Sequence, residues 1–221
     1  MGRAKEIIVK VIPSSVAVPF VKQHHYSGTV SNTSALHFGC FLDDKLHGVM
    51  SFGSPMDKSK VLPLVQPCLW NEMLELNRMA FDDYLPKYSE SRCISIAVKL
   101  IKKNAPHIKW ILSYSDGCSC GDGTIYRASG FVLTQIKINQ IIRIIDGKLV
   151  AKNYANKKYY DKTKGINKFN GSKIKEGYQL RYIYLIDKTC KITVPIIPFS
   201  KIDEIDRKST RLNSSHLGIS R

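Results

Sequence analysis

The order of elements predicted between residues 74 and 131 constrains this chain more than any other feature. Apolar residues at helical spacing alternate there with short apolar runs that are typical of strands. The predicted elements are a strand at 74–81, a polar loop at 82–91, a helix at 94–104, a strand at 110–114, a short helix at 123–129 and a strand at 131–134. This order predicts an α/β fold with a mixed sheet.

The segments on either side of this unit extend the pattern. The further predicted elements are a strand at 7–12, a helix at 16–25, a hairpin of 36–42 with 46–52, a hairpin of 138–145 with 148–151, and a strand at 181–186. Asp43-Asp44-Lys45 and Asp146-Gly147 supply the turn residues of the two hairpins. The sequence therefore predicts one mixed sheet with helices beside it.

Positive charge is concentrated in one part of the chain. The 221 residues carry 34 Lys and Arg against 18 Asp and Glu, a formal net charge of +16. Residues 1–136 hold 15 basic and 11 acidic side chains, whereas residues 137–191 hold 14 and 4. Because cations neutralise phosphates and aromatic rings stack on unpaired bases, this basic, Tyr-rich segment predicts a nucleic-acid surface. Its aromatic residues are Tyr154, Tyr159, Tyr160, Phe169, Tyr178, Tyr182 and Tyr184.

Seven residues of this segment are the expected nucleic-acid contacts. They are Lys157, Lys158, Tyr159, Lys162, Lys164, Lys168 and Arg181. The alternative is a solvated basic face whose tyrosines pack a small sheet, because a run of charge alone is weak evidence for a ligand.

The charge distribution also suggests how the chain is organised. Residues 1–136 are expected to form the core, residues 137–191 a basic strand and loop region that completes the fold and faces nucleic acid, and residues 192–205 a C-terminal segment. Residues 206–221 back-translate to a common sequencing adapter read in frame, so we expect them to be an artefact without structure. Without this tail the chain has 30 basic and 17 acidic side chains, or +13.

Hydropathy and cysteine usage indicate a cytosolic protein. No apolar run approaches the length that spans a bilayer. The six cysteines are scattered, so reduced thiols are expected rather than a disulfide framework. Cys118 and Cys120 are spaced more tightly than the usual zinc ligands, which favours loop thiols over a metal site.

The loop before the helix at 94–104 is a candidate anion site. The first turn of a helix presents free backbone N–H groups to whatever lies in the preceding loop. Ser89 and Ser91 can cap this helix, and Arg92 can pair with a phosphate. An ordinary capped helix is the alternative interpretation.

Asp116, His25 and Tyr26 are candidate reactive residues. Asp116 follows the strand at 110–114, and side chains at the carboxyl ends of strands face the crevice where α/β sheets bind ligands. It is interpreted as a general base or as the group that orients an amine, with helix capping or loop bracing as the alternative. His25 and Tyr26 combine a group that shuttles protons near neutral pH with a hydroxyl donor, although packing is the commoner role of such a pair.

Several motifs in one order resemble known families. The segment from Tyr126 to Phe131 resembles the Tyr-x-x-x-Gly-Phe signature of the GNAT acetyltransferase fold, although residues 86–92 stand where that fold has a glycine-rich loop. The chain from about residue 15 to 186 is similar to the bacteriophage Mom family of DNA adenine-modifying proteins. The matching motifs are His25-Tyr26-Ser27, Phe38-Gly39, Gly48 to Gly53, Glu75 to Arg78, Pro86-Lys87, Ser89 to Arg92, Ser113 to Asp116, Gly123 to Ser129 and Gly177 to Tyr182.

This resemblance implies a GNAT-like, mostly antiparallel central sheet flanked by helices, with a basic C-terminal extension. It also implies a phage-encoded enzyme of the host cytoplasm that places a carbamoylmethyl group on adenine N6 of DNA and so hides sites from restriction endonucleases. The family's reactive residues match His25, Tyr26 and Asp116, and Tyr126 is expected to protonate the leaving group. The implied donor is acetyl-CoA-like or glycyl-tRNA-like, held by Ser89, Ser91 and Arg92, and iron has been proposed to take part.

Two rival functions stay open from the sequence. The first is a GNAT-fold acyltransferase that acts on a small amine or a protein lysine, for which the basic segment is incidental. The second is a non-catalytic DNA-binding protein, which predicts that Asp116 and His25 point away from any shared site.

Overall fold

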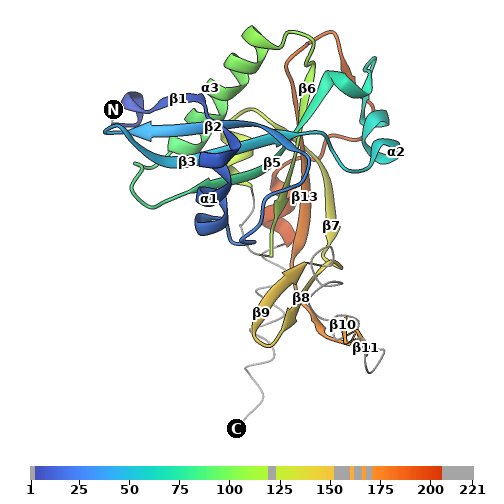
Figure 1. The fold of residues 1–221 in the computed structure, drawn as a ribbon. Helices are drawn as coiled ribbons and strands as arrows, with labels where there is room; N and C mark the ends of the chain where they lie inside the picture. The colour runs from blue at the N-terminus through green and yellow to red at the C-terminus, as the bar shows by residue number, and fades with distance from the viewer. Residues whose placement is uncertain (1–2, 119–122, 152–159, 162–165, 168–170, 206–221) are drawn as a thin grey trace.

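A seven-stranded sheet forms the centre of the protein (Figure 1). The computed structural model describes residues 3–118, 123–151, 160–161, 166–167 and 171–205. In spatial order the strands are β1 (Ile8–Val11), β2 (Ser34–Leu42), β3 (Lys45–Gly53), β5 (Met73–Phe81), β6 (Trp110–Asp116), β13 (Tyr178–Leu185) and β7 (Val132–Ile138). All neighbours are antiparallel except β5 and β6, which run parallel.

Helices cover both faces of this sheet (Figure 1). On one face lie α3 (Ser89–Asn104) and α4 (Thr124–Ala128), and on the other lie α1 (Ser14–His24) and α2 (Lys58–Val61). Short 3₁₀ turns occur at Arg3–Glu6, Leu62–Leu64 and Trp70–Glu72. This is the predicted mixed α/β architecture with a mostly antiparallel sheet, so the fold class is confirmed.

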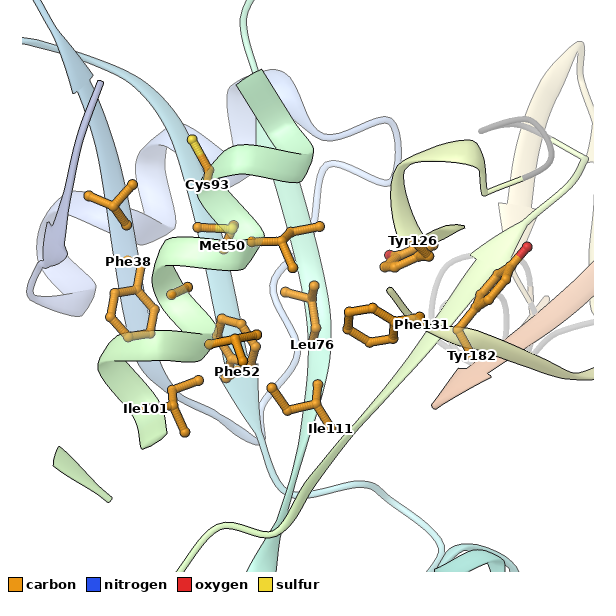
Figure 2. Packing of buried hydrophobic residues seen from close by; sticks show 14 of the residues in the cluster. Phe38, Met50, Phe52, Leu76, Cys93, Ile101, Ile111, Tyr126, Phe131 and Tyr182 are labelled. Carbon is orange, nitrogen blue, oxygen red and sulfur yellow. The ribbon is translucent and has the colours of Figure 1, made fainter. Parts of the chain in front are cut away.

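The main hydrophobic core lies between the sheet and α3 (Figure 2). Phe38 and Phe52 meet edge to face there with ring centroids 5.8 Å apart, and Ile94 and Ile101 of α3 are almost fully buried. The apolar residues of α3 recur at helical spacing, so one stripe of the helix faces the sheet. Burial of this stripe fixes α3 against one face of the sheet.

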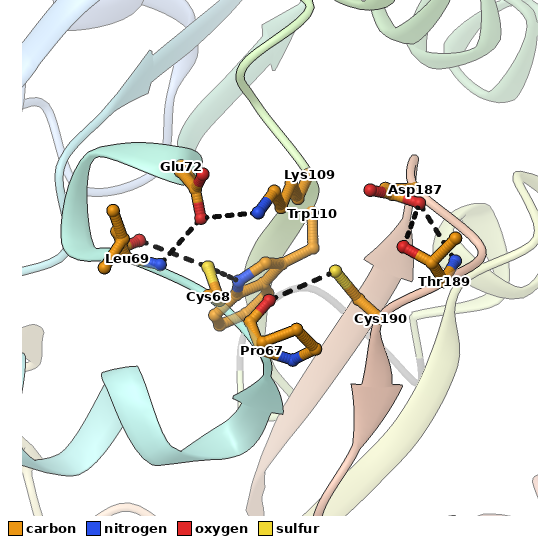
Figure 3. Close-up of polar contacts among 9 residues, drawn as sticks. All are labelled: Pro67, Cys68, Leu69, Glu72, Lys109, Trp110, Asp187, Thr189 and Cys190. Carbon is orange, nitrogen blue, oxygen red and sulfur yellow. Dashed lines mark hydrogen bonds and ion pairs between the residues drawn. The ribbon is translucent and has the colours of Figure 1, made fainter.

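The opposite face holds two smaller clusters. Val21 of α1 packs with Val49 and Ala80, while Trp110 and Leu112 pack beneath α2. The Trp110 indole N–H donates to Cys68 Sγ at 3.0 Å, and nearby the Cys190 thiol donates to the Pro67 carbonyl at 3.4 Å (Figure 3). These contacts fasten the pair of short strands β4 (Val65–Gln66) and β14 (Lys191–Ile192) beside the sheet.

The parallel strands β5 and β6 separate part of the way along their length. Their paired register runs from Met73 with Trp110 to Leu76 with Ser113. Beyond it β5 pairs only with β3, and β6 pairs only with β13. A bulge between Leu76 and Arg78 turns β5 at this point. The central sheet therefore opens at the carboxyl ends of its two parallel strands.

A small basic sheet projects from the ends of β7 and β13 (Figure 1). It contains β8 (Ile142–Ile145), β9 (Lys148–Ala151) and β12 (Lys173–Ile174). The two-residue strands β10 (Tyr160–Asp161) and β11 (Ile166–Asn167) pair with each other in a separate ladder. The buried Asn139 side chain holds its root, because its amide donates to the carbonyls of Ile142 and Lys175 at 2.9 and 2.7 Å. We call the described residues 139–151 and 171–177 the extension.

The structure moves several predicted boundaries. Helix α3 begins at Ser89, five residues before the predicted start, and β6 includes Asp116 instead of ending before it. Between the predicted strands at 46–52 and 74–81 the structure contains α2 and β4. β7 reaches Ile138, so the second hairpin begins later than predicted, at Ile142. The artefact prediction for 206–221 lies outside the described residues. None of the described helices is both long and apolar enough to cross a membrane.

Candidate active site

Polar residues gather on the α1 side of the sheet where β5 and β6 separate. Strand alternation and the bulge at residue 77 direct Glu75, Arg78, Tyr114 and Asp116 to this side. His25, the residue that follows α1, reaches the same side. We call these five residues the polar face.

His25 is held in place by the loop that it begins. Its Nδ1 accepts the backbone N–H of Ser27 at 3.2 Å and lies 2.8 Å from the Ser27 hydroxyl. Burial and, to a smaller extent, the charge of Arg78 lower the pKa of His25 to about 4. The imidazole is therefore neutral at physiological pH, with its proton on Nε2. The ring of Tyr26, 57% exposed, lies 4.4 Å from the His25 ring.

Arg78 ties β5 to the loop after His25. Its Nε donates to the Thr29 carbonyl at 2.8 Å, which links the strand bulge to the end of α1. Three residues earlier, burial raises the pKa of Glu75 to about 7, and the charge of Arg78 opposes part of that shift. Glu75 can therefore gain or lose a proton near neutral pH, which suits a group that takes part in proton transfer.

Asp116 ends β6 with one carboxylate oxygen unpaired. Its Oδ1 accepts the Cys118 N–H at 3.0 Å, whereas its buried Oδ2 has no hydrogen-bond partner among the described residues. The side chain is 9% exposed. A buried acceptor without a donor is costly in a structural role, and so it points to a ligand that supplies the missing proton.

Tyr114, two residues before Asp116 on β6, and Arg181 on β13 lie on the same side of the sheet as the rest of the polar face. They are register partners on β6 and β13, and burial raises the pKa of Tyr114. The Arg181 guanidinium donates to the hydroxyl and the carbonyl of Thr134 at 3.0 and 3.3 Å. Arg181 is thus half-buried and fixed against β7.

Tyr126 is the buried residue of α4 and lies on the other side of the sheet. It is 7% exposed, and its ring stacks on Tyr182 at 4.9 Å and meets Phe131 edge to face at 5.5 Å (Figure 2). The structure therefore holds Tyr126 rigidly, on the α3 side of the sheet, away from the polar face.

The candidate donor residues at the start of α3 are engaged within the protein. The buried Ser89 hydroxyl donates to the Pro86 carbonyl, and the Ser91 hydroxyl donates to the Tyr88 carbonyl at 3.2 Å. The expectation that these serines cap the helix through N–H groups is wrong, because the N-cap is Tyr88 in the left-handed region at φ 69°. The Arg92 guanidinium donates to the Lys5 carbonyl at 3.2 Å.

Six of the seven predicted nucleic-acid contacts lie between residues 152 and 170. Lys157, Lys158, Tyr159, Lys162, Lys164 and Lys168 lie outside the described residues. The cations that the structure describes near the extension are Lys137, Arg143, Lys148, Lys173 and Lys175. Among them Lys137, Lys148 and Lys173 are exposed, so positive charge does reach the surface on this side of the molecule.

A metal centre finds no support in the residues that the structure describes. Three or more His, Cys, Asp or Glu side chains do not converge on one point anywhere in this part of the chain. The polar face offers His25, Glu75 and Asp116, but they do not form such a group. The donor set does not fit the iron implied by the resemblance, so no step is derived through iron.

Comparison with known proteins identifies the family. The model of the Mom protein family matches residues 6–201. The chain belongs to the Mom protein family. A relative in that family, described as methylcarbamoylase mom of Escherichia phage Mu, is 34% identical over 128 residues, which cover 58% of this chain. The match spans about half of that relative, 53% of its length.

Solved structures share the fold of this Mom family member. IAA acetyltransferase from Bacillus cereus superposes with a TM-score of 0.50 at 11% identity, over 81% of this chain and 99% of its own. Spermidine/spermine N-acetyltransferase SpeG from Vibrio cholerae gives 0.51 at 9% identity, over 83% and 95%. The GNAT-like fold predicted for the chain is thus confirmed.

Sequence reasoning named only part of the polar face. His25 and Asp116, which the sequence does name, lie on the same side of the sheet. Glu75 and Arg78 were noted only inside a family motif, and Tyr114 had no role. A Glu inside an apolar strand such as Met73–Phe81 was the available signal, since a carboxyl group there must be buried or face a site.

Proposed function

We propose that this protein is a phage DNA-modifying transferase that converts adenine N6 to its carbamoylmethylated form and so protects DNA from host restriction. The observation that carries the proposal is the buried Asp116 Oδ2, unpaired among the described residues, at the point where β5 and β6 separate. The family and the relative described as a methylcarbamoylase favour this chemistry over transfer to a small amine or a protein lysine.

Adenine N6 is a weak nucleophile because its lone pair is delocalised into the ring. The enzyme must therefore position N6 and remove a proton as it attacks. In the proposed step the N6 lone pair bonds to the carbonyl carbon of an activated acyl group, and Asp116 Oδ2 accepts the N6 proton. The bond between that carbon and the donor's sulfur or oxygen then breaks, and the leaving atom takes a proton from water, because Tyr126 lies on the opposite side of the sheet from Asp116.

His25 and Tyr26 are suited to hold the base. The neutral His25 ring carries its proton on Nε2 and can donate to a ring nitrogen of adenine, while the exposed Tyr26 ring can stack on the base. Because base pairing and stacking hide N6 in a duplex, the adenine must be flipped out or already single-stranded. The cations of residues 137–191 would bind the DNA backbone.

An activated glycyl group fits the product better than an acetyl group. Transfer of glycyl to N6 gives an amide with the same atoms as a carbamoylmethyl group. If the glycyl amine attacks adenine C6, a five-membered ring forms, and cleavage of the bond between C6 and the original N6 opens it again. The glycyl nitrogen then occupies the N6 position and the original N6 becomes the terminal amide, with no oxidant and no further atoms required. The donor would then be glycyl-tRNA-like, although a CoA thioester supplies the same activated carbonyl.

The donor phosphates are proposed to bind at the start of α3, near Ser89, Ser91 and Arg92. The two serine hydroxyls are already used by backbone carbonyls, so the contacts would come chiefly from the N–H groups of the first helical turn. Arg92 would leave the Lys5 carbonyl and pair with a phosphate.

Mass spectrometry of nucleosides tests this function. DNA would be isolated from cells that express the wild type, Asp116→Asn, or the matched surface variant Asp187→Asn. We expect modified adenine with the wild type and with Asp187→Asn, and a loss of roughly 100-fold or more with Asp116→Asn. Fragmentation of the modified nucleoside separates the glycyl from the carbamoylmethyl isomer. Unmodified adenine in all three samples, from folded full-length protein, would overturn the proposal.

A further inference from the structure

Gln179 lies directly opposite Asp116 on the neighbouring strand of the sheet. The two are register partners on β13 and β6. The neighbouring pair, Gly117 with Tyr178, is joined by a 2.8 Å bond from the Gly117 N–H to the Tyr178 carbonyl. Since bonded and non-bonded pairs alternate in antiparallel ladders, Asp116 and Gln179 form a non-bonded pair, in which side chains approach most closely, with Cβ atoms about 4.5–5.5 Å apart.

The Gln179 side chain is available to a ligand. It is partly exposed, so a ligand can reach it. Its backbone is fixed between β6 and β7, where its register partner on the far side is the exposed Lys137. Asp116, Gln179 and Lys137 therefore form one row across three strands, on the side of the sheet that carries the polar face.

The root of the extension lies at the end of this row. Cys118, two residues after Asp116, packs against Gly177, whose φ of +137° and close approach leave no room for a side chain: a Cβ there would lie 2.7 Å from Cys118 Sγ. The Asn139 N–H donates to the Gly177 carbonyl at 2.9 Å. A DNA strand bound along the extension would thus reach the polar face at Asp116 and Gln179.

A carboxamide is the group that matches the Hoogsteen edge of adenine. That edge presents one N6 proton and the acceptor N7, and a Gln side chain supplies an acceptor and a donor at the same spacing. Guanine presents two acceptors there and leaves the carboxamide oxygen without a donor. Pairing at N6 and N7 uses one N6 proton and leaves the other for the neighbouring carboxylate.

We infer that Gln179 is the specificity-determining residue for the base: its carboxamide pairs with N6 and N7 of adenine while Asp116 faces the second N6 proton. This inference rests on the proposed function, because it places adenine in the same site. It assigns base recognition to β13 and leaves proton transfer to Asp116.

Binding to a modified base tests this inference without any donor. The probes are single-stranded oligonucleotides with randomised flanks around one central adenine, 7-deazaadenine or guanine. 7-Deazaadenine keeps N6 but lacks the N7 acceptor. We expect the wild-type full chain to bind the adenine probe roughly 10- to 100-fold more tightly than the 7-deazaadenine or guanine probe.

The variant Gln179→Leu should bind the adenine and 7-deazaadenine probes equally. The control Gln23→Leu, at an exposed position of α1, should keep the wild-type preference. Equal binding of adenine and 7-deazaadenine by the wild type would overturn the inference, even if co-expressed DNA is modified. Unmodified co-expressed DNA together with a clear adenine preference would instead reject the transferase and keep the recognition role of Gln179.

Discussion

The two faces of the central sheet are built from the same strands, but where β5 and β6 separate one face is apolar and packed and the other carries buried polar groups. On the α3 side, Leu76 and Ile111 join a packed apolar core. On the α1 side, Glu75 and Asp116 bring carboxyl groups out of water. Because residues alternate along a strand, one sequence can stabilise the fold on one face and hold reactive groups on the other.

The buried polar face lowers the stability of the folded protein. Burial disfavours the charged forms of Glu75 and His25, so their pKa values move in opposite directions, to about 7 and about 4. The apolar core on the far side supplies the stability that offsets these groups. Variants on the two faces should therefore behave differently in stability and in pH dependence.

The largest effect is expected from the apolar face. Phe52 is fully buried and packs edge to face on Phe38. We expect Phe52→Ala to lower the free energy of unfolding by about 3–5 kcal/mol, because it removes buried surface and leaves a cavity. Urea denaturation measures the change. Tyr88→Ala, at an aromatic ring that is 80% exposed, should stay within about 0.5 kcal/mol of the wild type. If Phe52→Ala lowers the free energy of unfolding by less than about 1 kcal/mol, the α3 side of the sheet is not the face that stabilises the fold.

Glu75 should make the polar face less stable as the pH rises. Its folded pKa of about 7 lies above the ordinary value of 4.5, so between these values the folded protein holds a proton that the unfolded chain releases. The contribution of Glu75 to stability therefore falls from pH 4.5 to 7, by up to about 3 kcal/mol. Glu75→Gln cannot ionise and should remove this fall in urea denaturation at pH 5 and pH 8.

Glu72 provides a control with the opposite sign. It ends the 3₁₀ turn just before β5, where the Leu69 N–H and Lys109 lower its pKa (Figure 3). Glu72→Gln should therefore leave the Glu75 contribution between pH 4.5 and 7 in place. If Glu75→Gln keeps the wild-type pH dependence, the Glu75 carboxyl group is hydrated and the two faces differ less than the burial indicates.

His25 should show the reverse pH dependence. Its folded pKa of about 4 lies below the ordinary 6.5, so the unfolded chain binds a proton first and stability is lost as the pH falls from 6.5 to 4. Titration by NMR should place the midpoint of the His25 ring near pH 4 in the folded protein and near 6.5 in urea. A folded midpoint at 6.5 would mean that the ring is solvated and free to carry charge.

Sequence patterns predicted the elements better than the site. The turns at Asp43-Asp44 and Asp146-Gly147 were identified because residues with positive φ mark hairpins, and all four do adopt positive φ. Asp116 and His25 were identified as candidates by position and type. Glu75 and Gln179 were not, because their roles depend on which face each strand presents and on the register between β6 and β13. Register joins residues 63 positions apart, and no local pattern encodes it.

The smallest effect is expected at the outer end of the row from Asp116 through Gln179. Lys137 is exposed on β7, so Lys137→Ala should change the free energy of unfolding by no more than about 0.5 kcal/mol. If DNA crosses this row, the slope of log affinity against log salt should fall by about 1, because one phosphate contact is lost. Lys99→Ala, on exposed α3 at the opposite face, should leave the slope unchanged. Equal slopes for the wild type and Lys137→Ala would show that DNA does not cross this side of the sheet. A smaller slope for Lys137→Ala alone would show that DNA binds on the side of the polar face, so that one face of the sheet binds DNA and the other holds the hydrophobic core.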